Sequence, residues 1–194
     1  CVNYSQNDIE PEAIGDAKYI YVEGYLWDTP TQKEAVVAAL KHAKSVGTKI
    51  SMSLSDSFCV ERHKPDFQNL LDKYVDLVFC NDAEAQIMTD KSTTSDQLKV
   101  LSDSVEHIVL TLGKKGSVVY NNGNITEINA IEVEAIDTTG AGDSYAAGYL
   151  YGITNGYTEE ESGNLAAYCA ATIVNQLGPR YNGDLKAKVH QYLK

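Results

Sequence analysis

The sequence from Ile136 to Gly156 reads IDTTGAGDSYAAGYLYGITNG, a turn of glycine and alanine followed by a run typical of a helix. The first N–H groups of a helix have no partner inside it, and they carry the positive end of its dipole. Gly140 and Gly142 have no Cβ and Ala141 has only a methyl group, so an anion can approach these amides closely. The stretch therefore predicts a helix over 140–155 that begins at a candidate anion site.

Two aspartates flank this turn, and two interpretations of them remain open. In the first, Asp137 caps an ordinary helix and Asp143 interacts with the helix dipole. In the second, Asp143 is a base beside bound phosphate. Other phosphate and nucleophile motifs do not fit, because no stretch has the Walker A spacing, a dinucleotide fingerprint would need glycine at Tyr145, and a nucleophile elbow would need glycine at Ala146.

The amino-acid composition is that of a globular protein and argues against several classes of protein. The chain has 194 residues, of which 43% are hydrophobic and 22% charged, with a net charge of −11. A strongly acidic chain is a poor nucleic-acid binder, since phosphate contacts need clustered Lys and Arg. No apolar run approaches the roughly 20 residues of a membrane span. The four cysteines are widely spaced without a CxxC pair, which favours reduced thiols in a cytoplasmic protein.

Apolar runs alternate with segments of helical period along the chain. Strands are expected over 17–27, 48–55, 75–81 and 106–113, and a hairpin turning at Asn122-Gly123 within 116–135. Helices are expected over 29–46, 64–74, 82–90, 94–104, 140–155 and 159–175. This alternation predicts an α/β fold with a doubly wound, mostly parallel sheet flanked by helices.

Ligands of such sheets lie beyond the carboxyl ends of the strands. Three successive strand ends carry polar or glycine-rich turns, namely NDAE from Asn81, TLGKKGS from Thr111 and DTTGAGD from Asp137. Each turn also has a purely structural explanation. Asn81 and Glu84 have the spacing of a capping box, and the glycines of the second turn suit a tight turn entering a hairpin.

Together these motifs resemble those of the ribokinase-like (PfkB) carbohydrate and nucleoside kinases. DTTGAGD is similar to the family signature DTxGAGD, NDAE to its NxxE motif and TLGKKGS to its TxGxxG loop. Tyr145 departs from the phenylalanine common in the family, a change expected to be tolerated because the ring packs. The resemblance implies that residues 1–194 form the nucleotide-binding C-terminal portion of a longer kinase domain, without the N-terminal portion and its β-sheet lid.

By this resemblance, Asp143 is the catalytic base that accepts the proton of the acceptor hydroxyl, and Gly140, Ala141 and Gly142 form the anion hole. Asn81 and Glu84 position Mg²⁺ near the phosphates of ATP. The nucleotide-binding positions are Thr111, Gly113, Gly116, Ala167, Ala171 and Asn175.

The implied reaction is transfer of the γ-phosphoryl group of ATP to a hydroxymethyl hydroxyl of a sugar or nucleoside. A monovalent cation such as K⁺ near Asp137 and Thr139, and a homodimer formed through the missing lid, are further implications of the resemblance. The alternative is a non-catalytic nucleotide-binding or regulatory module that keeps the fold. The presence of Asp143 favours an enzyme.

Overall fold

The computed structural model describes residues 3–181 and 183. It contains six strands in the order β1-β2-β3-β4-β5-β6, so each strand neighbours the next one along the chain. Strand β1 pairs in parallel with β2, and β2 with β3. The chain divides into unit 1 (1–109 and 121–123) and unit 2 (110–120 and 124–194), and each unit is described by itself.

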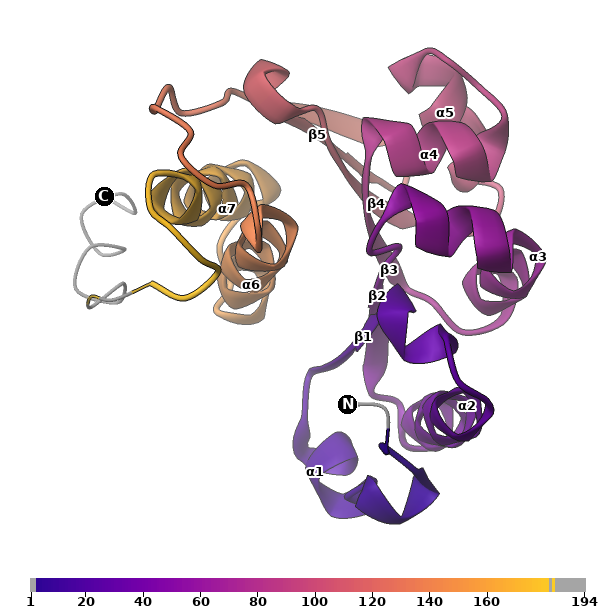
Figure 1. Cartoon of the computed structure of the whole chain (residues 1–194). Helices are drawn as coiled ribbons and strands as arrows, with labels where there is room; N and C mark the ends of the chain where they lie inside the picture. Colours follow the sequence, from indigo (N-terminus) through magenta and orange to yellow (C-terminus); the bar gives the residue numbers. More distant parts are fainter. Residues whose placement is uncertain (1–2, 182, 184–194) are drawn as a thin grey trace. The chain divides into compact units, whose positions relative to one another are not determined.

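Unit 1 is an α/β layer in which helices α2 to α5 cover one face of the strands (Figure 1). Its strands are β1 (Tyr19–Glu23), β2 (Lys49–Ser53), β3 (Leu77–Asn81) and β4 (His107–Thr111), the last of which runs into unit 2. Its helices are α1 (Pro11–Asp16), α2 (Pro30–Val46), α3 (Ser57–Lys73), α4 (Asp82–Thr89) and α5 (Thr94–Leu101), with 3-10 turns η1 (Gln6–Asp8) and η2 (Gly24–Trp27).

Local sequence signals explain most of these boundaries. Thr29 caps α2 through its side chain, Pro30 occupies the first turn, and Gly47 ends the helix with φ of 82°. Helix α3 begins at Ser57, earlier than the expected residue 64. Asp56 caps it by accepting the Cys59 N–H, and Pro65 lies inside the helix and does not open it.

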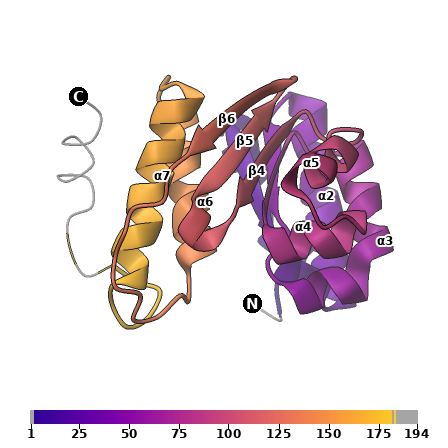
Figure 2. The same cartoon turned by 90° about the horizontal axis from the view of Figure 1, so that it is seen from above.

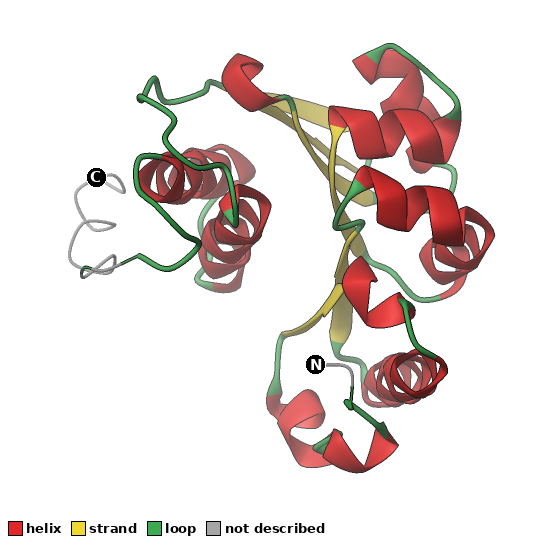
Figure 3. Ribbon diagram, in the orientation of Figure 1, coloured by secondary structure: helices red, strands yellow, loops and turns green. Residues whose placement is uncertain are grey.

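Unit 2 joins a hairpin to a pair of helices. The hairpin consists of β5 (Ser117–Asn121) and β6 (Asn124–Ile128), after a 3-10 turn η3 (Gly113–Lys115). Asn122 and Gly123 both have positive φ, as the predicted turn requires. Residues 129–140 form a long loop between β6 and α6 (Figure 3), although their apolar alternation suggested an extension of the hairpin.

Helices α6 (Ala141–Thr154) and α7 (Glu159–Val174) pack side by side (Figure 2). Small residues make this contact close, because a Cβ on Gly152 would overlap Ser162 and a Cβ on Gly148 would lie 2.8 Å from the Cα of Ala166. The predicted stop between the helices is confirmed, with Asn155 as the C-cap and Gly156 at φ of 84°.

Candidate active site

The start of α6 leaves backbone amides open to a ligand. Gly140 is the N-cap with φ of 78°, and no side chain caps the helix. The Ala141 N–H donates to the Thr138 carbonyl oxygen at 3.2 Å, so it is less available than the sequence suggested. A Cβ on Gly142 would meet nothing within 4 Å, and this residue is exposed. The helix start is therefore an uncapped positive end with open space at Gly142.

Asp143 is the third residue of α6 and is exposed. No described residue forms a hydrogen bond or ion pair with its carboxylate. Its neighbour Asp137 behaves differently, since its carboxylate accepts the Thr139 N–H at 2.9 Å and the Gly178 N–H at 3.0 Å. These hydrogen bonds, that of Thr139 first, lower the pKa of Asp137. The interpretation of Asp137 as the cap of α6 is therefore wrong, because its oxygens bind its own loop and the segment after α7.

The C-terminal end of α7 lies against the loop that leads into α6. The Val174 carbonyl oxygen accepts the N–H groups of Ile136 at 2.7 Å and Asp137 at 3.3 Å. The Asn175 side chain donates to the Glu134 carbonyl oxygen at 2.9 Å. A Cβ on Gly140 would lie 2.7 Å from the Pro179 Cβ. Asn175 is thus brought beside the loop that leads into α6, whereas Ala167 and Ala171 are buried along α7.

The TLGKKGS loop is a tight turn closed by a backbone hydrogen bond between its two ends. The Leu112 N–H donates to the Gly116 carbonyl oxygen at 2.8 Å, and Gly113 and Gly116 have φ of 59° and 93°. A Cβ on Gly116 would overlap the carbonyl oxygen of Ile128, so only glycine allows this approach to the end of β6. Thr111 ends β4 at the mouth of the turn. The structural explanation of these glycines is confirmed, and their role toward a nucleotide stays a prediction.

A buried hydrogen bond joins this loop to α6. The hydroxyl groups of Ser117 and Tyr145 lie 2.6 Å apart, and both side chains are buried. Burial raises the pKa of Tyr145 to about 12, so its hydroxyl stays neutral. The tyrosine that departs from the family pattern therefore packs as expected, and its extra oxygen has a partner.

Asn81 and Glu84 form the predicted capping box in unit 1. The Asn81 side chain accepts the Glu84 N–H at 2.9 Å, and the Glu84 carboxylate accepts the Asn81 N–H at 3.0 Å. Glu84 is only 4% exposed. Burial, with the negative charge of Asp56 in support, raises the pKa of its carboxyl to about 7 against the opposing effect of the Asn81 N–H.

A divalent cation fits this pair by its chemistry, since carboxylate and amide oxygens are hard ligands and a cation would offset the buried charge. Within 3–181 and 183, no group of three or more His, Cys, Asp or Glu residues is placed to hold a metal ion. Water and phosphate oxygens would have to complete the coordination.

Asp56 is a site residue that the sequence analysis missed. It lies three residues after the end of β2, and Asn81 is the last residue of β3; a position near a strand end was therefore the available signal. Ser55, just before it, has φ of 75°, which is rare for a residue other than glycine and costs about 1–3 kcal/mol. Such strain concentrates at functional sites, so the end of β2 joins the candidate site.

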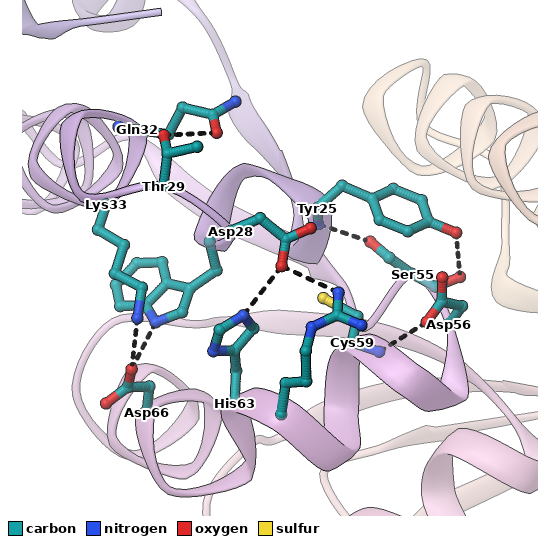
Figure 4. Close-up of polar contacts among 12 residues, drawn as sticks. Tyr25, Asp28, Thr29, Gln32, Lys33, Ser55, Asp56, Cys59, His63 and Asp66 are labelled. Carbon is teal, nitrogen blue, oxygen red and sulfur yellow. Dashed lines mark hydrogen bonds and ion pairs between the residues drawn. The ribbon is translucent and has the colours of Figure 1, made fainter. Parts of the chain in front are cut away.

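A polar network fixes the segment after β1 beside Asp56 (Figure 4). Asp28 accepts a hydrogen bond from Arg62 at 2.9 Å and lies 3.0 Å from the His63 Nε2 atom; these contacts, that of His63 first, lower the pKa of Asp28. Asp66 accepts hydrogen bonds from Trp27 at 2.7 Å and Lys33 at 3.1 Å. The network anchors η2 and the residues after it to α2 and α3.

The known proteins that this chain resembles are kinases. The model of the pfkB family carbohydrate kinases matches residues 3–185. Adenosine kinase of Dictyostelium discoideum is 26% identical over 85% of this chain and 52% of its own length. The 5-dehydro-2-deoxygluconokinase of Geobacillus kaustophilus is 27% identical over 97% of this chain and 59% of its own length. The chain spans little more than half the length of these two relatives.

Solved structures agree with the fold. The adenosine kinase of Sinorhizobium meliloti has a TM-score of 0.95 and 37% identity, covering 98% of this chain and 59% of that one. The aminoimidazole riboside kinase of Salmonella enterica, solved with aminoimidazole riboside and an ATP analogue, has a TM-score of 0.85 at 18% identity, covering 98% of this chain and 67% of that one. The second likeness concerns the fold alone.

Proposed function

The chain belongs to the pfkB family of carbohydrate kinases, and from this premise we propose that it transfers the γ-phosphoryl group of ATP to a hydroxymethyl hydroxyl of a sugar or nucleoside. The observation that carries the proposal is the uncapped start of α6, where an exposed carboxylate without a described partner follows the GAG turn.

In this proposal Asp143 accepts the proton of the acceptor hydroxyl. Phosphoryl transfer has a loose transition state, so positioning and charge stabilisation contribute most, and a carboxylate is a sufficient base. The amides of Gly140 and Gly142 stabilise the negative charge on the transferred group. The Ala141 amide contributes less, because Thr138 already accepts its hydrogen bond.

We assign Thr111, Gly113 and Gly116 to the nucleotide phosphates and Ala167, Ala171 and Asn175 to its base and ribose. The support is that the Asn175 end of α7 is hydrogen-bonded to the loop leading into the α6 turn, within one unit.

Asn81 and Glu84 would hold Mg²⁺ largely through water, with Asp56 as a further acidic partner. Bound there, the ion would screen the charge of the phosphates. A monovalent cation at Asp137 and Thr139 has weaker support, because both oxygens of Asp137 already accept N–H groups.

Two further expectations belong to this proposal. The cytoplasm is the expected compartment, since the described cysteines Cys59, Cys80 and Cys169 are free and buried. In the part of the chain that the structure describes, no helix is long and apolar enough to cross a membrane. A small-molecule acceptor remains the expected partner.

The experiment is ATP consumption by the whole protein over a panel of sugars and nucleosides, with Asp143→Asn as the variant. Asn fits the first turn of a helix, so the melting temperature and ATP affinity should stay near those of the parent. Turnover should fall about 10²- to 10⁴-fold, as expected for loss of a general base. Glu160→Gln is the matched control, because Glu160 is an exposed acid in the first turn of α7.

A non-catalytic nucleotide-binding module makes the opposite prediction. It would bind ATP without consuming it in the presence of any acceptor, and Asp143→Asn would change nothing. Equal turnover in the parent and Asp143→Asn would also contradict the role of the base.

A further inference from the structure

Gln97 of α5 is a buried glutamine whose side-chain amide binds both ends of α4. The residue is 0% exposed. Its Nε2 atom donates to the Asp82 carbonyl oxygen at 3.3 Å and to the Asp82 carboxylate at 3.1 Å, at the start of α4. It also donates to the Lys91 carbonyl oxygen at 3.2 Å, one residue after the C-cap of that helix. One side chain of α5 therefore holds both ends of the eight-residue α4.

The surroundings of this amide determine its orientation. Three oxygen atoms lie around Nε2, and turning the amide over would place Oε1 against three acceptors. In the orientation that the structure has, Oε1 is buried and has no hydrogen-bond partner among the described residues. A buried acceptor without a partner lowers stability, and a methionine of similar length would avoid that cost. The glutamine therefore makes its hydrogen bonds to α4 at the expense of stability, which suggests a role beyond packing.

The residue that Gln97 binds lies inside the motif proposed to hold Mg²⁺. Asp82 stands between Asn81 and Glu84, whose side chains form the capping box at the start of α4. The capping hydrogen bonds fix these two side chains relative to the first turn of their own helix. The hydrogen bonds from Gln97 fix that turn to a neighbouring helix, and so to the rest of unit 1.

An ion pair also contacts the far end of α4, but it is a weaker constraint. The Lys64 ammonium group of α3 lies 2.7 Å from the carboxylate of Asp90, the C-cap of α4. The Asp90 side chain is 82% exposed, so solvent and salt screen this pair. The hydrogen bonds of Gln97 are shielded from such competition because Gln97 is buried.

We propose that Gln97 is a positioning residue of the proposed metal site: by holding both ends of α4, it sets where Asn81 and Glu84 meet a magnesium ion. The inference rests on the proposed function and adds a residue to its metal site. Loss of a partner that orients metal ligands typically weakens metal affinity about 10- to 100-fold. A purely structural anchor of α4 is the alternative, and it predicts lower stability with an unchanged effect of Mg²⁺.

The test is titration calorimetry of the whole protein with a non-hydrolysable ATP analogue, in the presence and in the absence of Mg²⁺. Gln97→Met removes the amide and keeps the length of the side chain. It should reduce the enhancement of binding by Mg²⁺ about tenfold and leave binding without metal unchanged. Gln32→Met is the matched control, because it removes a buried glutamine amide from α2, and it should leave both affinities unchanged.

Asp82 offers a second pair of variants, which decides the matter if Gln97→Met does not fold. Asp82 is exposed, so both of its variants should fold. Asp82→Ala removes one acceptor of Gln97 and should reduce the enhancement by Mg²⁺, though less than Gln97→Met does. Asp82→Asn keeps an acceptor oxygen without the charge and should restore the enhancement of the parent. Equal losses in the two variants would mean that the charge of Asp82 matters and its hydrogen bond to Gln97 does not, which would overturn the inference.

Turnover provides a separate measurement in the whole protein. Gln97→Met should raise the Mg²⁺ concentration needed for half-maximal turnover, while kcat at saturating Mg²⁺ stays near that of Gln32→Met. A folded Gln97→Met variant with the same enhancement by Mg²⁺ as Gln32→Met would overturn the inference. Binding of the ATP analogue that needs both Mg²⁺ and Gln97, in a protein that phosphorylates no acceptor, would keep the inference and refute the proposed kinase activity.

Discussion

A single residue can serve the fold and the proposed chemistry together, and Glu84 is the example. Its carboxylate completes the capping box of α4 and is almost entirely buried. The structural and the functional interpretations of Asn81 and Glu84 were alternatives in the sequence, yet the hydrogen bonds from Asn81 offset only part of the cost of burying the charge. Burial, the largest cause, raises the pKa of Glu84 from 4.5 to about 7.

The first prediction concerns this raised pKa. The folded protein holds the Glu84 proton more tightly than the unfolded chain does, so stability is full below pH 4.5 and is lost as the pH rises through 7. Glu84→Gln keeps the shape and removes the titration. It should raise the melting temperature relative to the parent at pH 8 and have little effect at pH 4.5. An equal effect at both values would show that the carboxyl titrates normally.

The proposed metal role of Glu84 predicts a separate change. At limiting Mg²⁺, Glu84→Gln should lower turnover in the whole protein more than it does at saturating Mg²⁺. If the variant keeps the parent's rate at limiting Mg²⁺, the capping role stands alone.

At the scale of elements, α6 is tied to the phosphate-loop side of the sheet by one buried pair of hydroxyl groups. Ser117 begins β5 directly after Gly116, and Tyr145 follows Asp143 by two residues. The Ser117–Tyr145 hydrogen bond therefore joins the TLGKKGS loop to the helix that carries the proposed base.

A double-mutant cycle tests this link. Tyr145→Phe leaves the Ser117 hydroxyl buried without its partner, and Ser117→Ala does the same to the Tyr145 hydroxyl. Each single change should therefore lower the free energy of unfolding, measured with denaturant, by about 1–3 kcal/mol. The double variant buries neither oxygen and should cost less than the sum of the two. Additive single effects would mean that the two hydroxyl groups do not interact.

Some sequence signals are sufficient to place a helix or a turn, and others are not. The bounds of α2 and α7 and the Asn122-Gly123 turn were predicted because each depends on neighbours within a few residues. The start of α3 was missed because Pro65 has the character of a first-turn residue. The role of Asp137 was missed because its partner Gly178 is 41 residues away. The motifs located the candidate site, whereas its hydrogen-bond partners required the fold.

For the whole molecule, net charge and buried titratable groups together set the response to pH. The chain carries a net charge of −11, so moderate acidification relieves its self-repulsion. His107 at the start of β4 acts in the other direction. Burial, with a smaller effect of Lys49, lowers its pKa from 6.5 to about 4.

The unfolded chain therefore takes up a proton at His107 before the folded protein does. Its contribution to stability is full above pH 6.5 and is lost as the pH falls toward 4. His107→Gln should flatten the fall in urea midpoint over this range, although the variant can be less stable at pH 7. If His107→Gln lowers the urea midpoint equally at every pH, so that its dependence on pH keeps the same slope, the lowered pKa of His107 is contradicted.

The long loop between β6 and α6 has a consequence for peptide-bond cleavage. Residues 131–136 are all exposed, and the described anchors of this segment, at Glu134, Ile136 and Asp137, lie toward its end. Proteases cut where the backbone can leave its contacts at little cost, so a glutamate-specific protease should cut first after Glu132. Because Asp137 binds the Thr139 N–H in the α6 turn and the proposed nucleotide contact Asn175 binds Glu134 in the loop, bound ATP analogue should slow that cut. First cleavage within α6 or α7, unaffected by nucleotide, would contradict this. The loop would then report, as a cut that can be detected on a gel, whether the proposed anion site at Gly140 is filled.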